Sequence, residues 1–159
     1  MNTSKGCGCP GSEMIEFKVI TDKETDNQTG KIESQLRQWP IQMHLINPTA
    51  PYYQGADVLL TADCVGYALG DFHRNFLKNK ALAIACPKLD EGQDMYQEKI
   101  KSWLEEAKIN TLTVLIMQVP CCMGLMNLVR YAAENSKRKV PVKLVVVGVH
   151  GDILNEEWI

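Results

Sequence analysis

The sequence predicts an α/β fold, a mostly parallel open sheet with helices on both faces and cysteines at the C-terminal strand ends. Four short apolar runs are continuous rather than alternating, which indicates strands buried on both faces. Segments with apolar residues at helical spacing separate these runs, as in successive βαβ units. A length of 159 residues corresponds to about one domain with a core of its own.

The strand candidates follow one another along the chain after residue 35. Residues 40–46 (PIQMHLI) alternate like a half-buried strand, and a loop rich in proline and glycine follows them. The continuous apolar runs are residues 56–64, 80–88, 111–119 and 142–149. We expect these four runs to form the parallel sheet.

Amphipathic helical patterns connect the apolar runs. Apolar residues recur at helical spacing from Val65 to Phe76, within residues 94–109 and from Leu125 to Ala133. The basic residues 137–139 (KRK) suit the C-terminal end of the last helix, where the helix dipole leaves partial negative charge. We therefore expect a helix in each of these three connections.

The N-terminal part of the chain differs in composition from the rest. Residues 1–34 read as a Gly- and Cys-rich loop followed by a polar insertion, because residues 21–34 are polar and aperiodic. Residues 35–159 are expected to form the α/β domain, so the chain has one globular domain overall.

Composition and charge exclude several functional classes. The formal net charge of −2 lacks the basic footprint of nucleic-acid-binding proteins. No apolar run approaches the roughly 18 residues that a membrane span needs, and the N-terminus lacks the apolar region of a signal peptide. We expect a cytoplasmic protein with no nucleic-acid or membrane partner. Six cysteines in that compartment suggest metal or redox chemistry rather than structural disulfides.

Cysteines stand at the C-terminal ends of three consecutive predicted strands. Cys64 and Cys86 each follow an apolar run, and the adjacent pair Cys121 and Cys122 follows a third. The carboxyl ends of parallel strands meet at one edge of a sheet, so these thiols are expected to converge there. A small core role explains any single cysteine, but core residues have no reason to choose the same end of three strands.

The adjacent pair also lies at a predicted helix start. Free N–H groups and the helix dipole favour thiolates at that position, so we expect a lowered thiol pKa there. A disulfide between adjacent cysteines would be strained and would close a negligible loop. The N-terminal GCGCPGS (residues 6–12) supplies Cys7 and Cys9. It matches the G-x-G-x-x-G pattern of dinucleotide sites, but no strand precedes it, so we interpret it as a flexible loop able to cover a metal.

The ligand type narrows the choice of metal. Thiolate sites select zinc or iron–sulfur clusters. Structural zinc sites usually contain C-x₂₋₄-C pairs, and this sequence has no C-x-x-C. A [4Fe–4S] cluster is therefore favoured, with three sheet cysteines and one from the N-terminal loop. Zinc remains the alternative, as does a larger cluster held by six thiolates.

Several segments together resemble the ferredoxin-type iron–sulfur proteins of anaerobic bacteria that carry a C-terminal α/β domain. The matching segments are GCGCPGS (6–12), SQLRQWPIQMHL (34–45), GADVLLTADC (55–64), DFHRNFL (71–77), ACPKLD (85–90) and VPCC (119–122). The ferredoxin segment with its closely spaced cysteines is absent, and Met123 stands where the family pattern has glycine. The resemblance implies an iron–sulfur protein of anaerobic metabolism.

Three functions fit these observations. The first is a cluster-binding electron carrier or redox subunit that works with a redox partner protein, and it explains all the strand-end cysteines. The second is a thiol-redox enzyme in which Cys121 or Cys122 is the nucleophile and the other resolves it. The third is a metal-sequestering or cluster-delivery protein. The sequence does not decide whether the protein is an enzyme or what its oligomeric state is.

Overall fold

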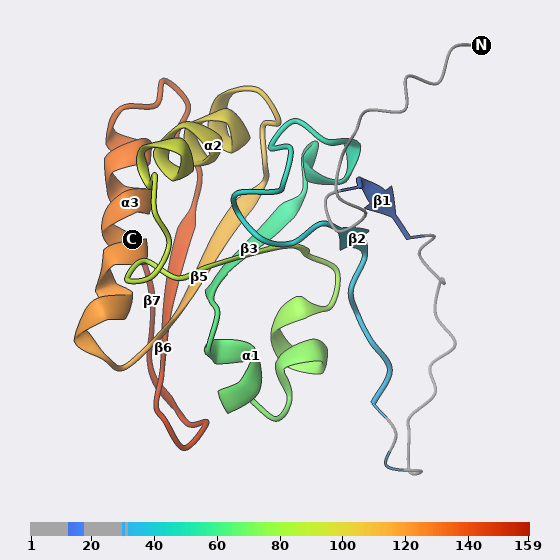
Figure 1. The fold of residues 1–159 in the computed structure, drawn as a ribbon, viewed down its shortest axis with the longest axis vertical. Helices are drawn as coiled ribbons and strands as arrows, with labels where there is room; N and C mark the ends of the chain where they lie inside the picture. Colours follow the sequence, from blue (N-terminus) through green and yellow to red (C-terminus); the bar gives the residue numbers. More distant parts are fainter. Residues whose placement is uncertain (1–12, 18–29, 31) are drawn as a thin grey trace.

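The computed structural model describes residues 13–17, 30 and 32–159 of the chain. A five-stranded sheet in the order β4-β3-β5-β6-β7 forms its centre (Figure 1). The strands are β3 (Asp57–Ala62), β4 (Ala81–Ala85), β5 (Thr111–Met117), β6 (Val142–Val147) and β7 (Ile153–Trp158). The first four are mutually parallel and β7 is antiparallel to β6. The predicted α/β fold with a mostly parallel open sheet is confirmed.

Helices cover both faces of this sheet. The helical elements are α1 (Val65–Ala68), the π-helix η3 (Phe72–Leu77), α2 (Asp94–Glu105) and α3 (Met123–Glu134). The connection from β3 to β4 runs one way along the sheet, and the next two run the other way. Right-handed crossovers therefore place α1 and η3 on one face and α2 and α3 on the other. Figure 1 shows α2 beside α3, with α1 well apart from them, and α2 packs directly on α3.

Adjacent strands β3 and β5 send their connections to opposite faces of the sheet. Such a reversal creates a topological switch point, and open α/β sheets bind ligands in the crevice beyond the strand ends at that point. The turn that joins β6 to β7, together with α1 and the start of α3, lies at the lower side of Figure 1, where the parallel strands end. The topology therefore indicates this edge as the place for a binding site.

The core forms because continuous apolar strands meet apolar helix stripes on both faces. Leu59, Leu60 and Leu115 are fully buried in the central strands. Ile100 and Trp103 of α2 are fully buried against the same core, as the predicted amphipathic pattern requires. No helix of the described residues is long and apolar enough to cross a membrane.

Four predicted elements differ in detail. Residues 40–46 form no strand: only Gln42 bridges to Ile84 of β4, and a turn follows. The helix expected from Val65 to Phe76 is divided into α1 and η3, because Leu69 is extended between them. The helix expected over residues 94–109 ends at Glu105, and a strand that the sequence pattern does not predict, β7, follows the run 142–149.

A small second sheet pairs β1 (Ile15–Glu16) with β2 (Gln38–Trp39) in antiparallel fashion. β1 falls within the predicted N-terminal segment 1–34, and β2 within the predicted α/β domain. Gln38 is fully buried, and its side chain donates a hydrogen bond to the backbone oxygen of Leu82 in β4. The chain before β3 is thereby tied to the outer side of β4.

Candidate metal centre at the edge of the sheet

Four cysteines lie where three parallel strands end. Cys64 follows β3, Cys86 directly follows β4, and Cys121 and Cys122 belong to the short 3-10 helix η4 (Pro120–Cys122) after β5. Because β4, β3 and β5 are adjacent and parallel, all four cysteines occupy one edge of the sheet. We call this edge, with loops 63–66, 86–90 and 119–123, the rim. The predicted common edge for these residues matches the structure.

The three loops of the rim approach one another. Cys64 and Cys121 both lie close enough to Cys122 to raise the pKa of its thiol. A Cβ atom added to Gly124, in the first turn of α3, would lie 3.1 Å from the Cβ of Pro87. The loop after β4 therefore packs on the start of α3, and the switch point brings all three cysteine-bearing loops together.

The four thiols differ in exposure and are all free. Cys64 and Cys121 are exposed, Cys86 is intermediate and Cys122 is buried. Burial raises the pKa of the Cys122 thiol, the nearby Cys121 and Cys64 raise it further, and a backbone hydrogen bond with Met117 opposes them. The expected lowering of the thiol pKa at this helix start is therefore wrong for Cys122, because desolvation outweighs the helix terminus.

The loop that carries Cys86 is closed by Asp90. The Cys86 N–H donates to Oδ2 of Asp90 at 2.9 Å, and the Asp90 N–H donates to the Cys86 carbonyl at 2.9 Å. The Tyr96 hydroxyl donates to the same Oδ2 at 2.5 Å, and Nε2 of Gln42 donates to it at 3.1 Å. Burial and the Asp90 carboxylate raise the pKa of Tyr96, which keeps its proton available for this bond.

Asp63, next to Cys64, has no comparable partners. Its Oδ1 atom is buried and has no hydrogen-bond partner among the described residues. Burial raises the pKa of Asp63, and the negative charge of Asp90 raises it further. The rim thus holds one carboxyl group that accepts three hydrogen bonds through a single oxygen and a second, nearby one whose buried oxygen accepts none.

Cysteine thiolates are the ligands that hold iron–sulfur clusters, and the rim supplies four free thiols. Within the described residues, however, no three His, Cys, Asp or Glu side chains are grouped so that they could hold a metal ion. Cys7 and Cys9, the predicted ligands from the N-terminal loop, lie outside the described residues. The rim therefore offers thiols of the right kind without a complete shell.

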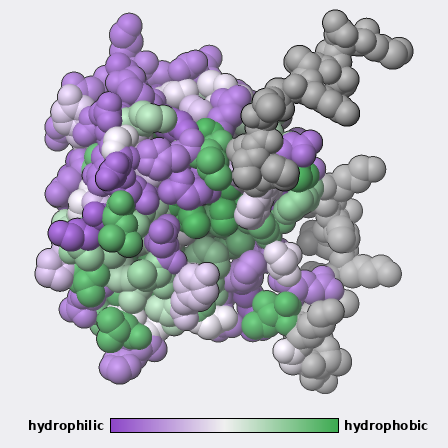
Figure 2. Space-filling model, in the orientation of Figure 1, coloured by the Kyte–Doolittle hydropathy of each residue, from purple (hydrophilic) through white to green (hydrophobic). Residues whose placement is uncertain are grey.

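Large apolar side chains surround the thiols. Tyr67 is 96% exposed and Leu89 is 79% exposed, and each follows a rim cysteine by three residues. Val119 and Met123 flank the Cys121–Cys122 pair, and Val149 follows β6 at the same edge; all three are exposed. Figure 2 shows patches of hydrophobic surface in the lower half of the view, on the side where the rim lies. Clustered exposed apolar residues are typical of interaction surfaces.

Comparison with known proteins identifies the domain. Residues 50–159 match the family described as a Rossmann-like domain. The chain belongs to the Rossmann-like domain family. The match covers the entire five-stranded sheet and the rim, and the G-x-G-x-x-G match at residues 6–11 lies outside it. The Rossmann-like domain accounts for the switch point, but a fold of this kind carries many unrelated functions.

The Rossmann-like domain has an archaeal relative. An uncharacterized protein of Archaeoglobus fulgidus is 31% identical over 119 residues, which is 75% of this chain and 83% of the relative. No solved structure matches the chain. The name of the relative states no activity, so chemical inferences rest on the rim itself.

Sequence reasoning found the cysteines of the rim but missed the network around Asp90. Asp90, Tyr96 and Gln42 are separated by up to 54 positions and belong to no motif. Only the ACPKLD segment, in which an acidic residue follows Cys86 by four positions, carries a signal of the turn. His73 accepts a hydrogen bond from the Gln35 N–H at 3.0 Å, which gives it a structural role.

Proposed function

We propose that this protein binds an iron–sulfur cluster, most simply one [4Fe–4S] cluster, and acts as an electron carrier or redox subunit. The proposed ligands are Cys64, Cys86, Cys121 or Cys122, and Cys7 or Cys9. The observation that carries the proposal is the meeting of three cysteine-bearing loops at one topological switch point. When bound, such a cluster supplies one-electron chemistry.

The residues of the rim have separate tasks in this proposal. Thiolates of the rim bind iron, and the backbone N–H groups at the start of α3 offer hydrogen bonds to the anionic site. Asp90 makes two hydrogen bonds with the backbone of Cys86, one through its carboxylate and one through its N–H, and so orients one proposed ligand. The exposed apolar residues around the thiols suit a redox partner protein. The proposed cytoplasmic location rests on the sequence patterns given above, and the proposed role in anaerobic metabolism rests on the family resemblance.

Purification without oxygen tests the proposal directly. We expect brown protein that contains iron and acid-labile sulfide in comparable amounts. Colourless protein with stoichiometric zinc contradicts the cluster and supports a structural metal site instead. Serine variants of Cys7 and Cys9 are expected to differ, since a four-thiolate shell needs one of them. Loss of iron from both variants favours the larger six-thiolate cluster.

A thiol-redox enzyme is the second candidate, and the Cys121–Cys122 pair favours it specifically. An exposed thiol stands next to a buried one, as an attacking and a resolving thiol require. In that case Cys64 and Cys86 are not needed for activity. Disulfide exchange that survives Cys64→Ser but not Cys121→Ser, in metal-free protein, supports this candidate. A metal-sequestering or cluster-delivery protein would instead transfer its metal to an acceptor.

A further inference from the structure

A cavity of about 270 Å³ lies beside the rim on the sheet face that carries α1 and η3. It is lined mainly by apolar side chains, and η3 contributes Phe72, His73 and Leu77 to its wall. Gly66 and the highly exposed Tyr67 line it next to the rim. π-Helical turns of this kind occur frequently at functional sites.

Asp63 provides the strongest polar feature of the cavity wall. Asp63 is only partly buried, but its Oδ1 atom is buried and has no hydrogen-bond partner within the described residues. The neighbouring Asp90 is already engaged by three donors and lies close enough to repel Asp63 electrostatically. No side chain or N–H of the described residues donates to this buried oxygen in the cavity wall, so a ligand that brings a donor and a positive charge would supply the missing partner.

The size of the cavity limits the ligand. A dry apolar cavity of about 150 Å³ accepts a benzene ring, and sites for drug-sized molecules begin near 300 Å³. A volume of about 270 Å³ therefore suits one ring or a short branched chain with a small polar head. We propose that this cavity binds a small primary amine, with the ammonium group on Asp63 and an apolar body against Phe72 and Leu77.

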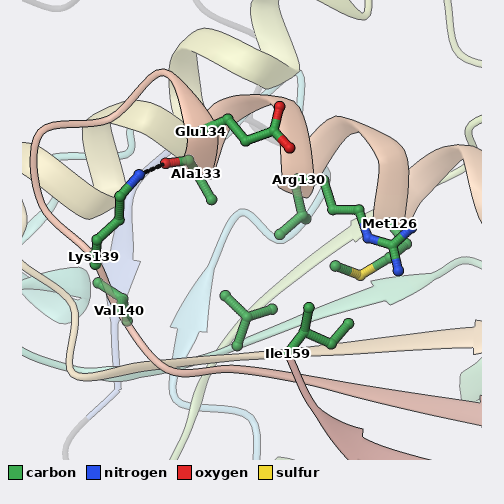
Figure 3. Close-up of a pocket in the computed structure, with 9 residues that line it drawn as sticks. Met126, Arg130, Ala133, Glu134, Lys139, Val140 and Ile159 are labelled. Carbon is green, nitrogen blue, oxygen red and sulfur yellow. Dashed lines mark hydrogen bonds between the residues drawn. The ribbon is translucent and has the colours of Figure 1, made fainter.

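A second cavity provides an internal comparison. It measures about 240 Å³ and lies between α3 and the end of the chain, lined by Met126, Arg130, Lys139 and Ile159 among others (Figure 3). The Lys139 ammonium group already donates to the carbonyl of Ala133 at 2.6 Å. No buried polar atom without a partner lines this cavity within the described residues. Its two cationic side chains outnumber the one carboxylate in its lining, Glu134, and so disfavour an amine. The two cavities should therefore differ in ligand preference.

The experiment compares three probes of similar shape on the full-length protein as purified without oxygen. Benzylamine, benzyl alcohol and benzoate are titrated by calorimetry, and protein NMR locates the binding site. We expect saturable benzylamine binding that is at least about tenfold tighter than benzoate binding. The affected resonances should be those of Phe72 and Leu77 and not of Ile159. Absence of saturable benzylamine binding in the millimolar range, or equal affinity for benzoate, overturns the proposal.

Variants assign the effect to the carboxyl group. Asp63→Asn should weaken benzylamine about tenfold or more while leaving benzyl alcohol within about twofold. Asp71→Asn is the matched control, because Asp71 is an exposed carboxylate near η3 that forms an ion pair with Arg74 and does not line the cavity. Unchanged benzylamine affinity in Asp63→Asn overturns the proposal. None of these measurements reports on iron, so the result is independent of the proposed cluster.

Discussion

Aspartate side chains at the two edges of the sheet differ in their hydrogen bonding. At the start of β3, Asp57 accepts hydrogen bonds of 2.7 Å from both the Asn110 amide and the Thr111 hydroxyl. Just past the end of the same strand, the buried Oδ1 of Asp63 has no partner among the described residues. One strand thus carries a satisfied aspartate at one end and an unsatisfied one at the other.

Other residues also distinguish the edge where the strands start from the rim. At the edge where the parallel strands start, the Arg138 guanidinium donates to the carbonyls of Leu104 and Ile109, so that it fastens the end of α2 to the loop before β5. At the rim, free thiols and exposed apolar side chains accumulate instead. Asp57 and Arg138 thus stabilise the starting edge through hydrogen bonds, whereas the rim, apart from Asp90, presents free thiols and exposed apolar side chains. Functional sites in folded domains commonly break local rules of satisfaction in this way.

The largest expected difference between the edges concerns iron. In protein purified without oxygen, Cys64→Ser and Cys86→Ser should each lower metal affinity about tenfold or more and reduce stability as much as Cys121→Ser. Asp57→Asn, at the opposite edge, should retain its iron. Iron analysis and the visible spectrum measure the outcome. A Cys86→Ser variant with full iron content and colour contradicts the proposed ligand set.

A second test compares two glycines with positive φ, one at each edge. Gly151 (φ +84°) lies in the turn after β6, and an added Cβ would lie 2.4 Å from the backbone oxygen of Ala68. We expect Gly151→Ala to lower the free energy of unfolding by about 2 kcal/mol or more, since strain and overlap add. Gly55→Ala (φ +60°) meets open space and should cost about 1 kcal/mol. Urea denaturation of both variants decides; equal losses would show that the turn yields freely.

The aspartates at the start of β3 and just past its end provide the third test. Asp57→Ala should cost about 1–2 kcal/mol of unfolding free energy, because it leaves two donors without their acceptor. Asp63→Asn should leave stability unchanged or raise it, since it removes repulsion from Asp90 and a carboxylate with a buried bare oxygen. Denaturation at neutral pH measures both. A loss in Asp63→Asn as large as that in Asp57→Ala would erase the contrast between the edges.

The smallest expected effect on folding belongs to the exposed apolar residues of the rim. Tyr67→Ser should change the free energy of unfolding by no more than about 0.5 kcal/mol, because the side chain is 96% exposed. Tyr53→Phe is a useful contrast at a buried site, since the Tyr53 hydroxyl donates to the Leu82 carbonyl at 2.9 Å. A loss beyond about 1 kcal/mol in Tyr67→Ser would assign this residue to the core rather than to a surface kept for binding.

Much of the fold could be predicted from the sequence because burial leaves a clear pattern. The central strands are continuous apolar runs, and α2 and α3 carry apolar stripes at helical spacing. β7 was missed since all six of its residues are exposed and give no such pattern. Residues 40–46 alternate like a strand, but they bridge β4 only at Gln42 before the chain turns.

The candidate site could be predicted only as far as chain order determines it. Strand ends in a parallel sheet share an edge, so the positions of Cys64, Cys86 and Cys121 followed from the strands alone. The raised pKa of Cys122 depends on burial. The Oδ1 atom of Asp63 lacks a partner because the fold places no donor of the described residues next to it. Both are tertiary properties, which periodicity and spacing do not encode.

The turn from Cys86 to Asp90 bears on how this domain can evolve. Its shape depends on the main chain of residue 86, the carboxylate of Asp90 and the support of Tyr96 and Gln42, and it makes no use of the sulfur atom. A substitution at residue 86 therefore alters the chemistry of the rim without dismantling the turn that presents it. Descendants of this chain can exchange, lose or regain a thiol at that position while inheriting the same turn.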